Sequence, residues 1–336
     1  MRERKERLLR IIDSFPKVSV AALADLVADE FVFGEISRVS REAPVLILKH
    51  RDRRVVPGGG ANAIYNLAAL DVDVFPVGIV GDDEPGRMLL KAFRQKKIPT
   101  TGILKVKGRE TVTKTRILAG HTHSSRQQVV RIDREPHDGL DHKIVRELVW
   151  HAQDYLRAAD ALLISDYGYG AATPKIWRAI RSTIKRRDEI PVTLDSRYRM
   201  TEYSGVTAAT PNEPEVEAAL RMRIGDDRER LFAAGKDLLG KMKLDALVIT
   251  RGRDGMACFT RKEKPVEIPI HGSDEVADVT GAGDTVIATF TAALAAGADA
   301  EDAARLANMA GGIVVTKRGT ATVSSDELRH AVAAAN

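Results

Sequence analysis

Cysteine is nearly absent from this sequence, and aromatic residues are scarce. Among 336 residues Cys258 is the single cysteine, and aromatic side chains contribute 5% of the chain. One thiol excludes an internal disulfide, and Cys258 has no partners at metal-ligand spacing, so redox chemistry and structural zinc are not expected. We predict a small, buried apolar side chain there. The few aromatic residues are not interleaved with basic clusters, which argues against nucleic-acid binding.

Long apolar runs are also missing. No run reaches the roughly 18 residues that indicate a membrane-spanning helix. A basic amphipathic helix is predicted for the first residues, MRERKERLLRIIDSF, which lack the apolar core of a secretory signal. We therefore expect a cytoplasmic protein without a membrane partner. The formal net charge is only +5, which suits an acidic, phosphorylated small molecule as the partner.

Apolar segments of strand length alternate with helical patterns along most of the chain. The strands are predicted at Val18–Leu23, Val74–Val80, Ala161–Ser165, Pro191–Asp195, Ala208–Pro211 and Ala246–Thr250. The helices between them include Ala61–Leu70, Arg87–Lys96, Asp141–Arg157 and Arg228–Lys241. Such alternation is typical of an α/β protein, in which helices cover both faces of a mostly parallel central sheet as a three-layer αβα sandwich.

Two segments interrupt the alternation. Residues 32–56 and 111–133 are β-rich, charged and free of long helices. We interpret them as one discontinuous β lid that projects from the main domain. No internal repeat, low-complexity segment or linker divides the chain. We therefore expect one domain over residues 1–336, with the lid as its only excursion.

One motif indicates catalytic chemistry. The segment Ala277–Ala296 reads ADVTGAGDTVIATFTAALAA. Gly281, Ala282 and Gly283 have little or no side chain, so their amides and those of the following helix can approach a phosphate and form an anion hole. Asp284 would repel a phosphate, but it is well placed to take a proton from an attacking hydroxyl. We predict a general base at Asp284; a simple helix cap is the alternative.

Polar residues near the first strand form a candidate sugar site. Asp25 and Asp29 follow the strand, where open α/β sheets bind ligands, although helix capping explains Asp25 equally well. Three glycines, Gly58–Gly60, open the next helix and suggest a close backbone approach or a tight turn. On that helix Asn62 can bind hydroxyl groups, whereas Asn66 could equally cap or pack.

Three later strands also end in acidic or amide residues. Asp166, Asp195 and the pair formed by Asn212 and Glu215 follow these strands, so they should share one rim of the sheet. Asn212 and Glu215 carry hard oxygen atoms that could hold magnesium directly or through water. The alternative is that Asn212 caps the helix that follows it.

Two further elements are candidates for nucleotide contacts. Thr250, Gly252 and Gly255 form a strand-to-turn element that could hold a nucleotide through the backbone, although any hairpin would look similar. A helix predicted over 300–316 carries Asn308 and an interior Gly311–Gly312 pair. Two glycines weaken a helix, so a ligand or a neighbouring backbone is expected against them.

With these residues in place, the chain resembles the ribokinase-like (PfkB-type) carbohydrate kinases over essentially its whole length. Within that family it is similar to the D-glycero-β-D-manno-heptose 7-phosphate kinases, which often form the N-terminal half of a bifunctional kinase/adenylyltransferase. The segments that carry the resemblance are ISRVSREAPV (Ile36–Val45), PGGGANAIYNLAAL, VRID (Val130–Asp133), ISDYG, ATPNE, DVTGAGDTVI and ANMAGGIVVTKRGTATVS.

The resemblance implies a ribokinase-like fold and an ATP- and Mg²⁺-dependent kinase of lipopolysaccharide precursor synthesis. The kinase would phosphorylate a heptose 7-phosphate at O1, and Asp284 would deprotonate the anomeric hydroxyl. Substrate binding is implied for Asp29, Gly59 and Asn62, with Arg131 holding the existing phosphate of the sugar. ATP binding is implied for Asn212, Glu215, Thr250, Gly252, Gly255 and Asn308, with Mg²⁺ near the first two, mostly through water. A homodimer built through the lid is also implied.

Two departures from the heptose kinase pattern keep other substrates open. Tyr169 replaces a lysine that is common after SDY, and Ser196-Arg197 replaces a usual Pro-Lys pair. A kinase of ribose, fructose or fructose 6-phosphate, or a sugar-phosphate-binding protein without turnover, would fit the same motifs. The sequence contains no H-x-G-H nucleotidyltransferase signature and ends about where the kinase fold should end. We therefore expect no adenylyltransferase domain in these residues, and another protein to supply that step.

Overall fold

The computed structural model describes residues 2–120, 127–136, 138–184, 190–272, 277–317 and 319–335. The strands are β1 (Ser19–Ala24), β2 (Leu26–Val39), β3 (Leu46–Gly59), β4 (Asp73–Gly81), β5 (Ile103–Val106), β6 (Thr113–Gly120), β7 (Gln127–Arg134), β8 (Ala161–Asp166), β9 (Val192–Ser196), β10 (Ala208–Ala209), β11 (Ala246–Thr250), β12 (Met256–Thr260) and β13 (Val266–Ile268). The helices are α1 (Arg2–Ser14), α2 (Gly60–Ala69), α3 (Glu84–Gln95), α4 (His142–Tyr155), α5 (Pro174–Ile180), α6 (Glu213–Leu220), α7 (Arg228–Met242), α8 (Ala282–Ala295), α9 (Ala300–Val314) and α10 (Ser325–Ala334).

A nine-stranded sheet runs through the main body in the order β13-β12-β11-β10-β9-β8-β1-β4-β5. The strands from β11 to β5 are parallel, and β12 and β13 join antiparallel at one edge. The parallel strands are short and apolar because both faces of the sheet are covered by helices. The predicted α/β class is therefore confirmed, and the six strands predicted for the main domain all lie in this sheet.

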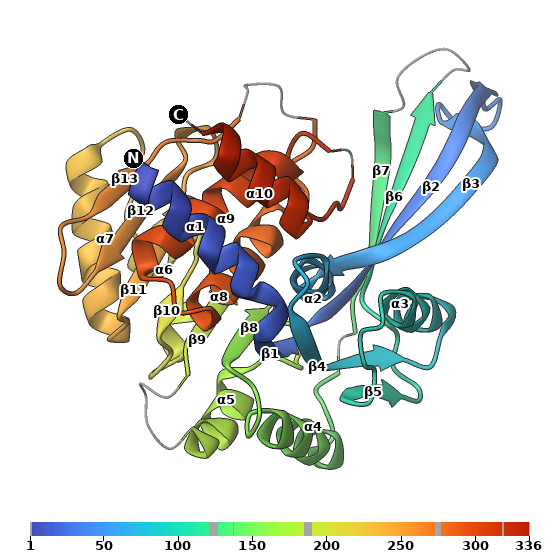
Figure 1. Ribbon diagram of the computed structural model, residues 1–336. Helices are drawn as coiled ribbons and strands as arrows, with labels where there is room; N and C mark the ends of the chain where they lie inside the picture. Colours follow the sequence, from blue (N-terminus) through green and yellow to red (C-terminus); the bar gives the residue numbers. More distant parts are fainter. Residues whose placement is uncertain are drawn as a thin grey trace.

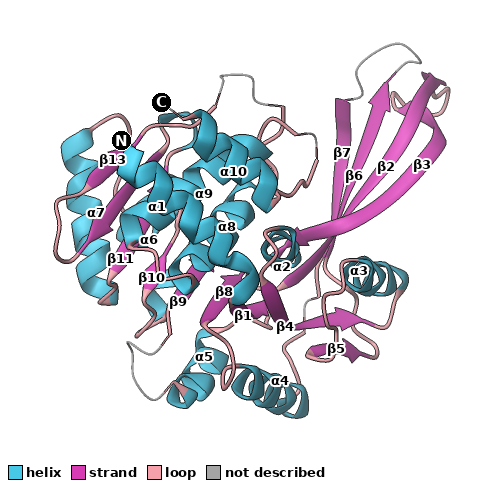
Figure 2. Cartoon of the chain, viewed as in Figure 1, coloured by secondary structure: helices cyan, strands magenta, loops and turns pink. Residues whose placement is uncertain are grey.

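Helices cover both faces of the nine-stranded sheet (Figures 1 and 2). Alternate residues of the strands pack into one helical layer or the other. On β1, Val20 and Ala22 point into a core shared with α1, α2, α8, α9 and α10. Their neighbours Ala21 and Leu23 point into the opposite core, against α4, α5 and α7. This period of two is what a strand buried on both faces requires. The result is the αβα sandwich expected from the sequence.

A second, four-stranded sheet projects from the main body beside α2 and α3 (Figure 1). Its order is β3-β2-β6-β7, with β2 and β6 parallel and the other neighbours antiparallel. We call it the small sheet. It includes the described parts of both segments predicted as a lid, but β2 begins at Leu26 and β3 continues to Gly59. The difference arises because only Asp25 separates β1 from β2, so no loop in the sequence marks the boundary.

Helix α8 lies against β8, β9 and α2 and is buried along most of its length. Its small and polar residues allow this close approach; Thr291, for example, shares a 2.6 Å hydrogen bond with Thr193 on β9. The first turn of α8 consequently lies where the parallel strands end. The fold thus places Asp284 at the edge of the sheet predicted to bind ligands.

Two other expectations from the sequence, on Cys258 and on the glycine pair of α9, are answered by the fold. Cys258 is buried on β12, as predicted. A neighbouring backbone lies against the glycine pair of α9, because a Cβ at Gly312 would stand 2.0 Å from the carbonyl oxygen of His271. Within the described residues no helix is both long and apolar enough to cross a membrane.

Candidate active site

A cavity of about 430 Å³ opens at the ends of the central strands. It is bordered by the ends of β8, β9 and β11 and by the first turns of α6 and α8. The polar residues that line it include Asp166, Tyr167, Asp195, Arg197, Asn212, Glu215, Thr250, Gly281, Gly283 and Asp284. The rim of strand-end residues predicted from the sequence is therefore present, and it shares one cavity with the predicted base.

The carboxylate of Asp284 accepts hydrogen bonds from two side chains that lie on different segments of the chain. Tyr167 donates its phenol hydrogen to Oδ1 at 2.7 Å, and Asn62 donates from Nδ2 to Oδ2 at 3.1 Å. Burial raises the pKa of Asp284 to about 7, since the loss of solvation outweighs the two hydrogen bonds that lower it. A carboxyl with this pKa can exchange a proton near neutral pH, which is the property required of a general base.

The backbone before α8 requires glycine. Gly281 is the N-cap of α8 with φ of 79°, and a Cβ there would lie 2.4 Å from Nδ2 of Asn62. Because glycine offers no capping side chain, the first amides of the helix remain available to a ligand. Gly281 and Gly283 line the cavity. The Ala282 amide instead donates to the carbonyl of Val279 at 3.2 Å, so it contributes least to the predicted anion hole.

Asn62 is itself held in place by Asn66. Asn66 donates from Nδ2 to the carbonyl and side-chain oxygens of Asn62 at 3.0 and 3.2 Å. The side-chain oxygen of Asn66 accepts from Thr285 and from the amide of Val323. These contacts join α2 to α8, which explains why the two asparagines occur one helical turn apart. Asn66 is therefore a structural link to the residue that contacts Asp284.

The small sheet presents charged side chains toward the same region. Asp29 pairs across the strands with Lys114, and Lys114 pairs with Asp133; Arg116 pairs with Arg131 two residues along. Directly paired residues and residues two apart share one face of a sheet. Asp29 is buried and accepts from Arg116 at 2.6 Å. Arg131 lies on the exposed strand β7 and donates two hydrogen bonds to Asp133.

Lys114 is a functional candidate that the sequence reasoning missed. Only 8% of its surface is exposed, and its Nζ lies 5.4 and 5.8 Å from the ring centroids of Tyr167 and Tyr169. Burial lowers the pKa of Lys114, and the charge of Arg131 lowers it further. Among the described residues no carboxylate forms an ion pair with this ammonium group. The charges of Asp29 and Asp133 act on its pKa in the opposite sense, without a direct ion pair. A buried cation with no direct ion pair beside the base is suited to receive an anion.

Asn212 and Glu215 form a reciprocal cap at the start of α6. The Glu215 amide donates to Oδ1 of Asn212, and the Asn212 amide donates to Oε2 of Glu215, both at 2.9 Å. The capping role considered as the alternative is therefore present. Both side chains also line the cavity, so the cap fixes them at its rim. Each retains oxygen lone pairs that can accept from the waters of a bound ion.

The donor set fits magnesium held largely through water. Asp195 lies on β9 in the same cavity, and its pKa lies well above the usual range because of burial and the nearby charges of Glu215 and Asp284. A hydrated hard cation beside these crowded carboxyl groups would favour their ionised form. In the described ranges no three His, Cys, Asp or Glu side chains form a direct metal-binding group. Asn212, Glu215 and Asp195 would therefore contact the waters of Mg²⁺ rather than enclose the ion.

The predicted nucleotide residues separate in the structure. Thr250 ends β11, bridges to Asn212 and lines the cavity. Gly252 and Gly255 have φ of 55° and 77° and form the turn to β12, as an ordinary hairpin turn would require. Asn308 donates to the carbonyl of Pro269 at 2.7 Å. These last three are not among the residues that line the cavity, and their role in nucleotide binding stays a prediction.

Three other residues on the sugar side and at the rim have clear surroundings. Gly59 has φ of 51°, and a Cβ there would press on Val27 and Tyr167, so it allows β3 to enter α2 next to the site. Tyr169, which replaces the common lysine, donates to Glu135 at 2.7 Å. Arg197 lines the cavity and supplies a cation at the rim.

Comparison with known proteins shows the family. The model of the pfkB family carbohydrate kinase matches residues 27–327. The chain is 42% identical over 316 residues to Bifunctional protein HldE of Geobacter sulfurreducens, and 39% identical over 320 residues to that of Gluconobacter oxydans. These matches cover 93% and 95% of this chain but 62% and 65% of the relatives, so the chain spans less than two thirds of their length.

Solved structures show the same fold at low identity. Arabidopsis thaliana ribokinase complexed with ribose and ATP aligns with a TM-score of 0.71 at 18% identity, covering 94% of this chain and 98% of that one. Escherichia coli phosphofructokinase-2 in complex with fructose-6-phosphate aligns with a TM-score of 0.72 at 17% identity, with the same coverage. These likenesses show the fold. The family match shows that the chain belongs to the pfkB family of carbohydrate kinases and is a phosphotransferase with a sugar hydroxyl as acceptor.

Proposed function

We propose that this kinase transfers the γ-phosphoryl group of ATP to O1 of D-glycero-β-D-manno-heptose 7-phosphate, giving the 1,7-bisphosphate. The observation that carries the proposal is the position of Asp284. This buried carboxyl has a pKa of about 7 and lies between a cavity that suits ATP and a cationic face that suits a second phosphate. Identity of about 40% to proteins named Bifunctional protein HldE supports the heptose assignment.

The transfer requires a base, an oriented hydroxyl and a stabilised phosphoryl group. Asp284 takes the proton of the attacking hydroxyl, while Asn62 and Tyr167 hold its two oxygens in position. The amides of Gly281 and Gly283 lie at the helix start, where the positive end of the helix favours the transferring phosphoryl. Mg²⁺, when bound near Asn212 and Glu215, would neutralise charge on the ATP phosphates.

The small sheet supplies the recognition of the phosphate that the sugar already carries. Lys114 is buried without a direct ion pair among the described residues, and Arg131 retains donors beyond the two that bind Asp133. A fork of guanidinium donors beside an ammonium group suits a phosphate dianion. Asp29 lies in the same row and can accept hydrogen bonds from sugar hydroxyls. This arrangement favours a sugar phosphate over a neutral sugar.

The proposal is tested by ADP release with Mg-ATP across a panel of sugars. The panel contains D-glycero-D-manno-heptose 7-phosphate, sedoheptulose 7-phosphate, fructose 6-phosphate, fructose and ribose. Preference for the manno-heptose phosphate is expected. Turnover of another member would retain the base and overturn the substrate, and absence of ADP release with every member would favour a binding protein without turnover.

We also propose that the protein is a cytoplasmic homodimer joined through the small sheet. The supporting observation is a set of large apolar side chains that remain exposed on this sheet and at its tip. They are Val39, Val45, Leu46, Val129, Val130 and Ile132. Such residues at the surface of a sheet are typical of an interface. The same sheet carries Lys114 and Arg131. Self-association would therefore restrict the movement of these two cations relative to the active site.

A further inference from the structure

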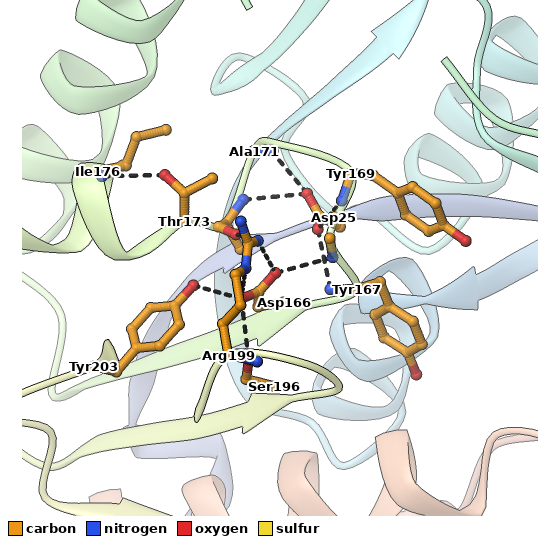
Figure 3. Close-up of polar contacts among 12 residues, drawn as sticks. Asp25, Asp166, Tyr167, Tyr169, Ala171, Thr173, Ile176, Ser196, Arg199 and Tyr203 are labelled. Atoms are coloured by element: carbon orange, nitrogen blue, oxygen red, sulfur yellow. Dashed lines mark hydrogen bonds and ion pairs between the residues drawn. The ribbon is translucent and has the colours of Figure 1, made fainter. Parts of the chain in front are cut away.

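A buried carboxylate accepts hydrogen bonds from several amides of the loop that carries Tyr167 (Figure 3). Asp25 follows β1 and is 1% exposed. Its Oδ2 accepts from the amides of Tyr167 and Tyr169 at 3.0 and 2.8 Å. Its Oδ1 accepts from the amides of Ala171 and Ala172 at 2.8 and 3.2 Å. Four backbone donors therefore converge on one side chain from an element distant in the sequence.

A second carboxylate closes the other side of this loop. Asp166, the last residue of β8, accepts from the amide of Gly168 at 2.9 Å, from Oγ of Ser196 at 3.0 Å and from the phenol of Tyr203 at 2.8 Å. Arg199 donates to both carboxylate oxygens of Asp166. Figure 3 shows these groups from β9 and the segment after it surrounding Asp166. The positive charge of Arg199 thus lies beside two neighbouring buried acids.

The loop forms no helix or strand of its own, so its conformation depends on side-chain contacts such as these. Residues 167–173 connect β8 to α5, and Gly168 and Gly170 have φ of 85° and 105°. Left-handed residues turn successive amides toward one side, which creates a concave set of donors for an anion. In this protein the anion is Asp25. Removal of that acceptor would leave four backbone donors without this partner, and those of Ala171 and Ala172 are buried.

The side chain of Tyr167 connects this loop to the active site. Tyr167 donates its amide to Asp25 and its phenol to Oδ1 of Asp284. Asp25 is buried, and both of its carboxylate oxygens accept from backbone amides of this loop, so it acts on the site through the loop. We propose that Asp25 is a positioning residue for phosphoryl transfer, which fixes loop 167–172 so that the Tyr167 phenol remains on Asp284. This inference rests on the role of Asp284 as the base in the function proposed above.

A double-mutant cycle tests whether Asp25 acts through Tyr167. The variants are Asp25→Asn, Tyr167→Phe and the two combined, each measured for kcat and for KM with ATP. Asp25→Asn is expected to lower kcat by about tenfold or more in the wild type, the effect of one lost hydrogen bond to a charged group. In the Tyr167→Phe background the same change should cost less than about twofold. Equal losses in both backgrounds would overturn the inference.

A matched control separates positioning from general destabilisation. Thr173 ends the same segment and caps α5, where its Oγ1 accepts from the amide of Ile176 at 3.2 Å. Thr173→Val should lower Tm without moving the acid limb of the pH profile. Asp25→Asn should move that limb to higher pH, because the Tyr167 hydrogen bond lowers the pKa of Asp284. The other charges acting on Asp284, including Asp29 and Lys114, are unchanged in both variants.

Native-state hydrogen exchange of the wild type keeps the inference testable if Asp25→Asn does not fold. The amides of Tyr167, Tyr169, Ala171 and Ala172 should exchange slowly although they lie in a loop. Fast exchange of these four amides would overturn the inference. A failure of the proposed function has a different signature, since Asp284→Asn would then retain full turnover while the four amides remained protected.

Discussion

Replacement of Asp284 by asparagine separates its role as a base from its role in the fold. Asparagine has the same shape, so the cavity and the glycine turn before α8 should survive. Turnover should fall by about 10²–10⁴-fold, which is the contribution of a positioned general base. The KM for ATP should remain nearly unchanged, because the nucleotide side of the cavity is lined by other residues. Coupled measurement of ADP release provides the assay.

The same substitution should lower turnover but should not lower the free energy of unfolding above pH 7. The carboxyl of Asp284 releases its proton near pH 3.8 in the unfolded chain and near pH 7 in the folded protein. The native state therefore binds more protons between these values, and wild-type stability falls as the pH rises through this window. The pKa difference corresponds to about 4 kcal/mol at pH above 7. The Asp284→Asn variant avoids this cost, because an amide does not ionise. One of the two donors would face the amide nitrogen in the variant, which offsets this gain in stability by about 1–3 kcal/mol.

At pH 8 the Asp284→Asn variant should therefore be at least as stable as the wild type by thermal unfolding. Thr289→Val serves as the control on the same helix, because Thr289 is buried and bonds only within α8. This control should retain turnover. The reasoning would be refuted if Asp284→Asn kept full activity, or if kcat/KM of the wild type did not rise with pH through an apparent pKa near 7.

Three further predictions concern the substrate, the packing and the assembly. Lys114→Met should raise the KM for the sugar phosphate by about 10-fold or more, with little effect on the KM for ATP. Arg134→Gln, on the opposite face of the small sheet, should leave the KM for the sugar phosphate unchanged. The same KM for the sugar phosphate in both variants would contradict the assignment. Gly312→Ala should lower stability by about 1–3 kcal/mol in denaturant unfolding because its Cβ meets a backbone carbonyl. Gly240→Ala on α7, where a Cβ meets nothing, should be neutral or stabilising. Val130→Asp should convert the proposed dimer to a monomer by light scattering, and an unchanged mass would exclude this face as the interface.

The main sheet and the position of Asp284 could be predicted because both depend on local patterns. Ala246–Thr250 was expected from an apolar run and is the observed β11. The glycines around Asp284 act within a few residues of it, so their effect is visible in the sequence. The boundary of the small sheet was missed because β1 continues into β2 with only Asp25 between them.

The remaining site residues depend on contacts between distant segments. Lys114 becomes notable only when the small sheet places it between Tyr167 and Tyr169. The available signals were that Lys114 lies in the segment 111–133 predicted as β-rich, and that Tyr167 lies two residues after the predicted strand Ala161–Ser165. The sequence indicated that the side-chain amide of Asn308 binds some group but could not show which one. In the structure this amide donates to the carbonyl of Pro269.

The measurement that tests the central claim most directly is ³¹P NMR of the product formed from D-glycero-β-D-manno-heptose 7-phosphate and Mg-ATP. The account predicts a second phosphomonoester signal, equal in intensity to that of the original phosphate and coupled to the anomeric proton. A new phosphate coupled to another carbon, or an unchanged spectrum with ATP still intact, would contradict it.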